Sequence, residues 1–165
     1  MKKKISGWVK EFTGSAKGPE APVWQPAGEL YPRLIDSDAA AMGLVVVSGM
    51  AIIWYLGVRP QWLRVIASRD LAASLAAAKV APAILGFQPK GGLFVAWARE
   101  PLPRATGLAS HLVAVVRPMF VGPLLPGEVA VLRDTPPIDC PLPPGSEQAA
   151  VKRRQSYIFL SLSQS

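Results

Sequence analysis

Two side chains that could take part in covalent catalysis occur once each in this chain, His111 and Cys140. A thiol becomes a strong nucleophile when a neighbouring base or cation favours its thiolate, and a histidine could be that base. His111, however, begins the apolar stretch HLVAVVR, where an imidazole more often has a structural role. Cys140 lies between Asp139 and Pro141 in a proline-rich segment, and its spacing from His111 matches no catalytic pattern. These residues therefore predict no catalytic site.

Motifs for binding phosphate, metal or a cofactor are also missing. The sequence has no GxGxxG, no GxxxxGK[ST] and no GxSxG, and the glycine-rich stretch GFQPKGG at 86–92 lacks the spacing that wraps a phosphate. A single cysteine forms no internal disulfide, and there is no Cys/His cluster for zinc or haem. We expect a non-enzymatic protein with no cofactor, no metal site and no evident small-molecule substrate.

The most distinctive feature of the chain is an uncharged apolar run at 39–58, AAAMGLVVVSGMAIIWYLGV. As a helix rising about 1.5 Å per residue, it would cover roughly the 30 Å hydrocarbon layer of a bilayer. Its length predicts a single transmembrane helix, although a buried core helix is an alternative. A cleavable signal peptide fits poorly because 38 residues precede the run. In a chain of 165 residues, this leaves room for one domain plus an anchor.

Residues at both ends of the run fit this interpretation. Aromatic rings favour the headgroup level, a following arginine acts as a polar stop, and a small-xxx-small pair lets another helix approach closely. The anchor residues assigned on these grounds are Ala39, Gly43, Trp54, Tyr55 and Arg59. The run is thus predicted to be an uncleaved signal anchor.

The N-terminal tail, 1–38, combines a basic amphipathic segment with a Pro/Gly linker. Apolar residues at helical spacing among lysines are typical of a helix lying on an anionic membrane surface. The residues predicted to form it are Lys2, Lys3, Lys4, Ile5, Trp8, Val9 and Phe12. A solvated, frayed terminus is the alternative. In the linker, Trp24 and Tyr31 either contact a partner or the membrane surface, or fold back on their own domain.

Two charge signals disagree about orientation. Arginines close to the run are more numerous on its C-terminal side, which would place the body in the cytoplasm. The distant N-terminal lysines instead favour a cytoplasmic N-terminus, and a long C-terminal region can be exported regardless of its charge. We prefer a single-pass protein of the bacterial inner membrane with a periplasmic body, and leave the opposite orientation open.

The body, 59–165, predicts an α+β fold. An alanine-rich juxtamembrane helix is expected at 61–79. Short β-branched or aromatic runs bounded by turn residues then predict roughly four strands, in an antiparallel or mixed sheet. These strands are expected at 93–99, 111–117, 129–133 and 157–162. Ten of the 17 prolines fall between Pro101 and Pro144, so the connections should be stiff and extended.

Two segments of the body could contact a partner. The stretch TPPIDCPLPPG at 135–145 predicts a polyproline-like crossing, which serves either as a ligand for a partner or as a rigid loop. VKRR at 151–154 adds a compact positive patch. The predicted contact residues are Pro136, Pro137, Pro141, Pro143, Pro144, Lys152, Arg153 and Arg154.

The net charge of +7 does not by itself indicate a nucleic-acid-binding protein, because no helix carries a basic stripe and no basic and aromatic residues interleave as a platform. The expected partners are membrane lipid and other subunits of a membrane complex, including further copies of this chain. The layout is similar to that of bitopic subunits of bacterial secretion, conjugation and pilus-assembly machines. We therefore expect an accessory or scaffold subunit of an envelope-spanning complex; the alternative is a membrane-tethered cytoplasmic module that binds anionic lipid or an acidic ligand.

Overall fold

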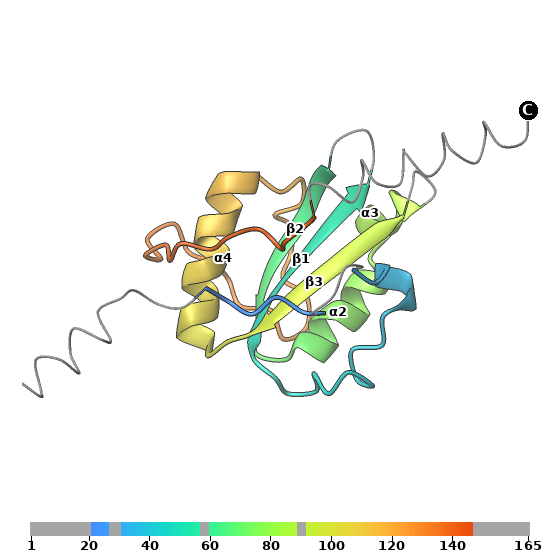
Figure 1. Ribbon diagram of the computed structural model, residues 1–165, viewed down its shortest axis with the longest axis horizontal. Helices are drawn as coiled ribbons and strands as arrows, with labels where there is room; N and C mark the ends of the chain where they lie inside the picture. Colours follow the sequence, from blue (N-terminus) through green and yellow to red (C-terminus); the bar gives the residue numbers. More distant parts are fainter. Residues whose placement is uncertain (1–20, 27–30, 57–59, 89–91, 147–165) are drawn as a thin grey trace, which may run out of the picture.

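The computed structural model describes residues 21–26, 31–56, 60–88 and 92–146, which fold around a three-stranded antiparallel sheet with strand order β2-β1-β3 (Figure 1). The strands are β1 (Gly49–Leu56), β2 (Pro60–Ser68) and β3 (Leu93–Arg99). The helices are the short 3₁₀ helix η1 (Leu34–Asp36), α2 (Leu71–Val80), α3 (Pro82–Leu85) and α4 (Leu102–Val116).

The central strand β1 is buried on both faces. Met50, Ile52 and Trp54 belong to the core beneath α4, whereas Ala51 and Ile53 belong to the core beneath α2 and α3. All five side chains are fully buried, as expected when helices cover both faces of the sheet (Figure 1). Because successive side chains of a strand point to opposite faces, a strand in this position must be apolar at every residue.

The predicted transmembrane helix at 39–58 is wrong for this reason. Residues 49–56 of the run form β1, and residues 39–48 consist mainly of turns that lead into the strand. In these turns the Asp38 side chain accepts from the backbone N–H of Ala41, and Gly43 has a φ of 75°. Among the described residues, no helix has both the length and the apolar composition needed to cross a bilayer. The signal anchor and the single-pass inner-membrane location inferred from this run fail with it. A continuous apolar run indicates a segment that is buried away from water, and here the segment is buried within the protein.

The helix predicted at 61–79 is two elements. Residues 60–68 form β2, which pairs with β1 along its length and places Ile66 opposite Ala51. The helix begins only at Leu71, because the Asp70 side chain caps it by accepting from the backbone N–H of Ala73 at 3.2 Å. Alanine richness therefore predicted helix correctly for α2 alone, while the tryptophan and β-branched residues before it form a strand.

Of the predicted strands, 93–99 is confirmed as β3. The segment 111–117 instead falls largely within α4, whose buried Ala105, Leu108, Ala109 and Leu112 follow the spacing of one helix face. Residues 129–133 form no regular strand, although the Val129 N–H donates to the Ala67 carbonyl at 2.8 Å. Residues 157–162 lie outside the described residues. The sheet therefore has three strands in the part of the chain described, and not the predicted four.

Irregular segments cover both outer edges of the sheet. Beside β2, the N–H groups of Met119 and Phe120 donate to the carbonyls of Trp62 and Leu63. Beside β3, residues near Gln25 and Pro32 form the equivalent contacts, as the blue segment in Figure 1 shows. Coverage of this kind leaves fewer unpaired backbone groups for another chain to pair with.

Candidate functional site

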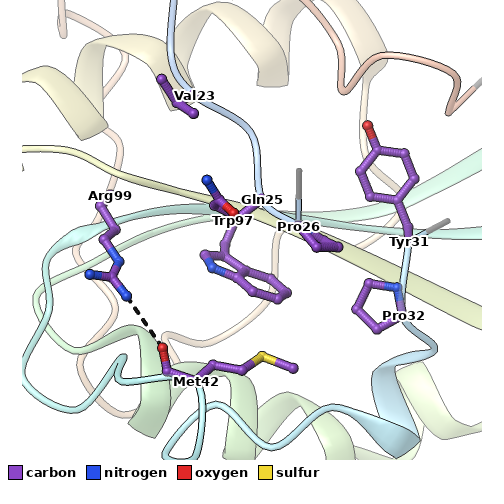
Figure 2. Close-up of a pocket in the computed structure, with 8 residues that line it drawn as sticks. All are labelled: Val23, Gln25, Pro26, Tyr31, Pro32, Met42, Trp97 and Arg99. Atoms are coloured by element: carbon purple, nitrogen blue, oxygen red, sulfur yellow. Dashed lines mark hydrogen bonds between the residues drawn. The ribbon is translucent and has the colours of Figure 1, made fainter. Parts of the chain in front are cut away.

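A cavity opens where the N-terminal segment leaves the outer edge of β3. Gln25 and Trp97 exchange two backbone hydrogen bonds, with N···O distances of 2.6 and 3.1 Å, and Val95 N–H donates to the Pro32 carbonyl at 3.2 Å. Between these contacts lies a cavity of about 740 Å³. Figure 2 shows the residues that line it, Val23, Gln25, Pro26, Tyr31, Pro32, Met42, Trp97 and Arg99.

The lining is apolar and aromatic with a cation at one side. The Trp97 indole lies at the centre, with Arg99 on one side of it and Tyr31 on the other (Figure 2). The Arg99 side chain makes one long hydrogen bond, from Nη2 to the Met42 carbonyl oxygen at 3.3 Å. Within the described ranges its guanidinium forms no ion pair, so its charge is available to an anion that enters the cavity.

The proline-rich segment fixes one wall of this cavity. We call residues 136–144 the proline strap. The indole N–H of Trp24 donates to the Pro141 carbonyl at 2.9 Å, and the Tyr31 hydroxyl donates to the Pro144 carbonyl at 2.5 Å. Val23 and Gln25, which flank Trp24, line the cavity, as does the Tyr31 ring. The strap therefore holds both parts of the N-terminal segment that border the cavity.

The strap also lies against α4, close to a glycine. Ile138 N–H donates to the Gly107 carbonyl at 2.9 Å. Just before the strap, the Thr135 carbonyl accepts from the Ser110 hydroxyl at 3.2 Å. A Cβ added at Gly107 would lie 2.6 Å from Ile138 Cδ1 and 3.2 Å from the Pro136 carbonyl oxygen. Glycine at this helix position allows the strap to approach the backbone.

The residues first considered for catalysis lie on the strap and on α4. Burial, reinforced by the charge of Glu100 and opposed by Arg104, raises the pKa of Cys140 to about 12. The thiol is therefore protonated at neutral pH and a weak nucleophile. His111 Nδ1 lies 3.6 Å from Asp139 Oδ1, whose side chain is fully exposed. No group of three metal-ligating side chains occurs among the described residues.

The predicted anchor residues have other roles here. Ala39 is buried in the turns before β1, and Gly43 has the positive φ of a tight turn. Trp54 is fully buried in an aromatic cluster, with ring centroids 5.1, 5.7 and 6.2 Å from those of Tyr31, Trp62 and Phe94. Tyr55 faces the opposite layer and contacts Phe87 at 5.8 Å. The aromatic residues thus fill protein cores.

The remaining predicted site residues divide into two groups. The five predicted contact prolines belong to the strap, which packs on this chain's own Trp24, Tyr31 and α4. Trp24 and Tyr31 accordingly follow the alternative of folding back on their own domain. The other positions lie outside the described residues: Lys2, Lys3, Lys4, Ile5, Trp8, Val9, Phe12, Arg59, Lys152, Arg153 and Arg154.

Sequence reasoning did not predict the cavity. Trp97 and Arg99 are two residues apart in a correctly predicted strand, which places them on the same face, but nothing local indicates that Met42 and Tyr31 join them. The segments that line the cavity come together only through pairing at the edge of β3. No family model, curated protein or solved structure matches this chain.

Proposed function

We propose that this protein is a binding module for a small organic acid with a flat apolar body, held in the cavity over Trp97. The observation that carries the proposal is the combination of an aromatic-lined cavity of about 740 Å³ with a guanidinium that has no acidic partner among the described residues. Ligand sites in proteins typically have this size and combine mostly apolar walls with a few polar groups.

The apolar part of the lining suits the flat body of the ligand, and the Arg99 guanidinium suits its carboxylate. The rings of Trp97 and Tyr31, with Pro26 and Pro32, offer apolar surface on which a planar body gains affinity by leaving water. Arg99 offers a planar fork of N–H donors that matches a carboxylate and forms stronger hydrogen bonds than a neutral donor would. Affinity should therefore come from the body, and selectivity for acids from Arg99.

The alternative hypothesis from the sequence was a membrane-tethered module that binds anionic lipid or an acidic ligand. The present proposal retains the acidic ligand but not the membrane tether. A scaffold role in an envelope-spanning complex depended on the anchor at 39–58, of which residues 39–56 form a strand and its preceding turns. The proposed role is binding, which the apolar lining and the single guanidinium support.

The test is titration of the full chain with a panel of aryl and alkyl carboxylates, led by 2-naphthoate, and with the matching neutral alcohols. We would follow binding by calorimetry and by the indole N–H resonance of Trp97. We expect carboxylates to bind, and Arg99→Gln to weaken 2-naphthoate binding by about 10- to 100-fold, the worth of a hydrogen bond to a charged group. Binding of the alcohol should change little.

Arg117→Gln is the matched control, because Arg117 is exposed at the end of α4 and does not line the cavity. It should leave 2-naphthoate binding unchanged. The proposal fails if no carboxylate of the panel binds, or if Arg99→Gln and Arg117→Gln have the same effect.

A further inference from the structure

The proline strap is hydrogen-bonded to residues that line the cavity or lie next to its lining. Tyr31 lines the cavity with its ring and donates its hydroxyl proton to the Pro144 carbonyl. The Trp24 indole N–H donates to the Pro141 carbonyl, and the two chain neighbours of Trp24 line the cavity. A movement of the strap would therefore remove the hydrogen bonds that position the aromatic wall.

We propose that the proline strap is a latch, so that its docking on Trp24, Tyr31 and α4 and the binding of a ligand in the cavity stabilise each other. The ligand half of this inference rests on the proposed function, whereas the opening of the strap does not. Coupling between two binding events is reciprocal, so a ligand that favours the docked strap is itself bound more tightly when the strap is docked.

The contacts of the strap suit a segment that opens before the rest of the fold. Prolines have no N–H, so the strap makes few backbone hydrogen bonds, and Ile138 is the strap residue that donates to α4. Four of its prolines are exposed, while Cys140 and Pro143 are buried. Segments with few hydrogen bonds and a small buried area open locally at lower free energy than global unfolding.

The charges on the strap do not oppose its return to α4 after opening. The strap has one charged side chain, Asp139, which lies 3.6 Å from His111 on α4 and is fully exposed. Besides its hydrogen bonds, the strap packs the side chains of Ile138, Cys140 and Leu142 against the core beneath α4. Opening therefore exposes apolar surface and no buried charge on the strap.

Cys140 reports on opening, because it is the single cysteine of the chain and is 5% exposed when the strap is docked. A thiol reagent such as 5,5′-dithiobis(2-nitrobenzoate) can reach it only after the strap leaves α4 or the protein unfolds. The rate of labelling at native conditions then measures the fraction of open molecules.

The experiment compares labelling rates of wild type, Tyr31→Phe and the control Thr106→Ala at constant pH. Tyr31→Phe keeps the ring in the cavity and removes the hydrogen bond to the Pro144 carbonyl. The Thr106 hydroxyl donates to the Pro103 carbonyl within α4, so Thr106→Ala also removes one side-chain hydrogen bond but none made to the strap. We expect Tyr31→Phe to raise the rate about fivefold, with a smaller change in the urea midpoint of the whole fold. Thr106→Ala should leave the rate near that of wild type.

A second set of rates is measured with 2-naphthoate. We expect saturating 2-naphthoate to slow labelling of wild type, and Tyr31→Phe to weaken its binding. An unchanged rate in Tyr31→Phe, or a rise fully accounted for by lower global stability, would overturn the latch. If 2-naphthoate binds without slowing labelling, the coupling is wrong; if no carboxylate binds, the proposed function is wrong, while the labelling of Tyr31→Phe still decides whether the strap opens.

Discussion

Arg64 of β2 and Glu128 of the loop that covers this strand form an ion pair, with 2.5 Å between Nη2 and Oε1 and with side chains only 8% and 6% exposed. The same carboxylate oxygen accepts from the Leu125 N–H at 2.9 Å, and the same guanidinium nitrogen donates to the Pro123 carbonyl at 2.9 Å. The pair therefore attaches the 118–129 loop to the sheet. Since both charges are removed from water, each depends on the other.

Glu128→Gln should lower the free energy of unfolding by about 3 kcal/mol, because it leaves the buried Arg64 charge without its counterion. Urea denaturation followed by circular dichroism measures this change. The double variant Arg64→Met, Glu128→Gln should recover part of the loss, since no buried charge remains. A double variant less stable than Glu128→Gln would show that the pair contributes mainly through packing of the arginine.

Ile52→Ala and Ile53→Ala should each lower the free energy of unfolding by about 2–5 kcal/mol. The two neighbours face opposite cores of the sheet, and both are fully buried. A strand covered on one face alone would lose stability at only one of these positions. Val80→Ala, at an exposed residue of α2, is the control and should change stability by less than about 0.5 kcal/mol.

Gly107→Ala should raise the labelling rate of Cys140, although alanine normally favours the interior of a helix by about 1 kcal/mol over glycine. The new Cβ would lie 2.6 Å from Ile138 Cδ1 and 3.2 Å from the Pro136 carbonyl oxygen, so we expect the strap to shift away from α4. Thiol labelling and urea denaturation, measured together, separate the two effects. Slower labelling in Gly107→Ala would mean that Ile138 adopts another rotamer without moving the strap.

Stability should fall at alkaline pH partly through Cys140. Burial raises the pKa of its thiol from an ordinary 9.0 to about 12 in the folded protein, so folding favours the protonated form. This contribution is fully present below pH 9 and is lost as pH rises toward 12. Burial also raises the pKa of Tyr31, with the same sign.

Urea midpoints of wild type and Cys140→Ala between pH 7 and 10.5 test this prediction. The alanine variant lacks the thiol, so its midpoint should fall less over this range than that of wild type. Parallel curves for the two proteins would show that the thiol does not contribute to the pH dependence.

Elements governed by local physics could be predicted from the sequence. The run 93–99 is short, β-branched and aromatic between turn residues, and it is β3. The alanine-rich residues 71–80 are helical, although the predicted helix began too early because the Asp70 cap was not recognised. In 111–117, β-branched residues suggested a strand, but the apolar face of α4 packs on the sheet, and tertiary packing outweighs the weak local preference.

The candidate site depended on tertiary structure almost entirely. Its cation and its indole lie on one predicted strand, but the opposite wall comes from residues 23–26 and 31–32, in a stretch that shows no sustained period in the sequence. These residues are ordered by hydrogen bonds from Trp24 and Tyr31 to prolines more than 110 positions away. No local pattern encodes a contact of that separation.

By itself, the sequence determined that residues 39–58 include a segment removed from water, that the alanine-rich residues before Pro82 are helical, and that 93–99 is a strand. Only the tertiary structure decided what surrounds the apolar residues of β1, which are α4 on one face of the sheet and α2 and α3 on the other. The physical reason is that the hydrophobicity of a side chain determines the free energy gained when it leaves water. It does not determine which apolar groups then surround the side chain. The surroundings of β1 follow from its pairing with β2 and β3, which are distant from each other in sequence. This pairing gives the backbone N–H and C=O groups of β1 their hydrogen-bond partners.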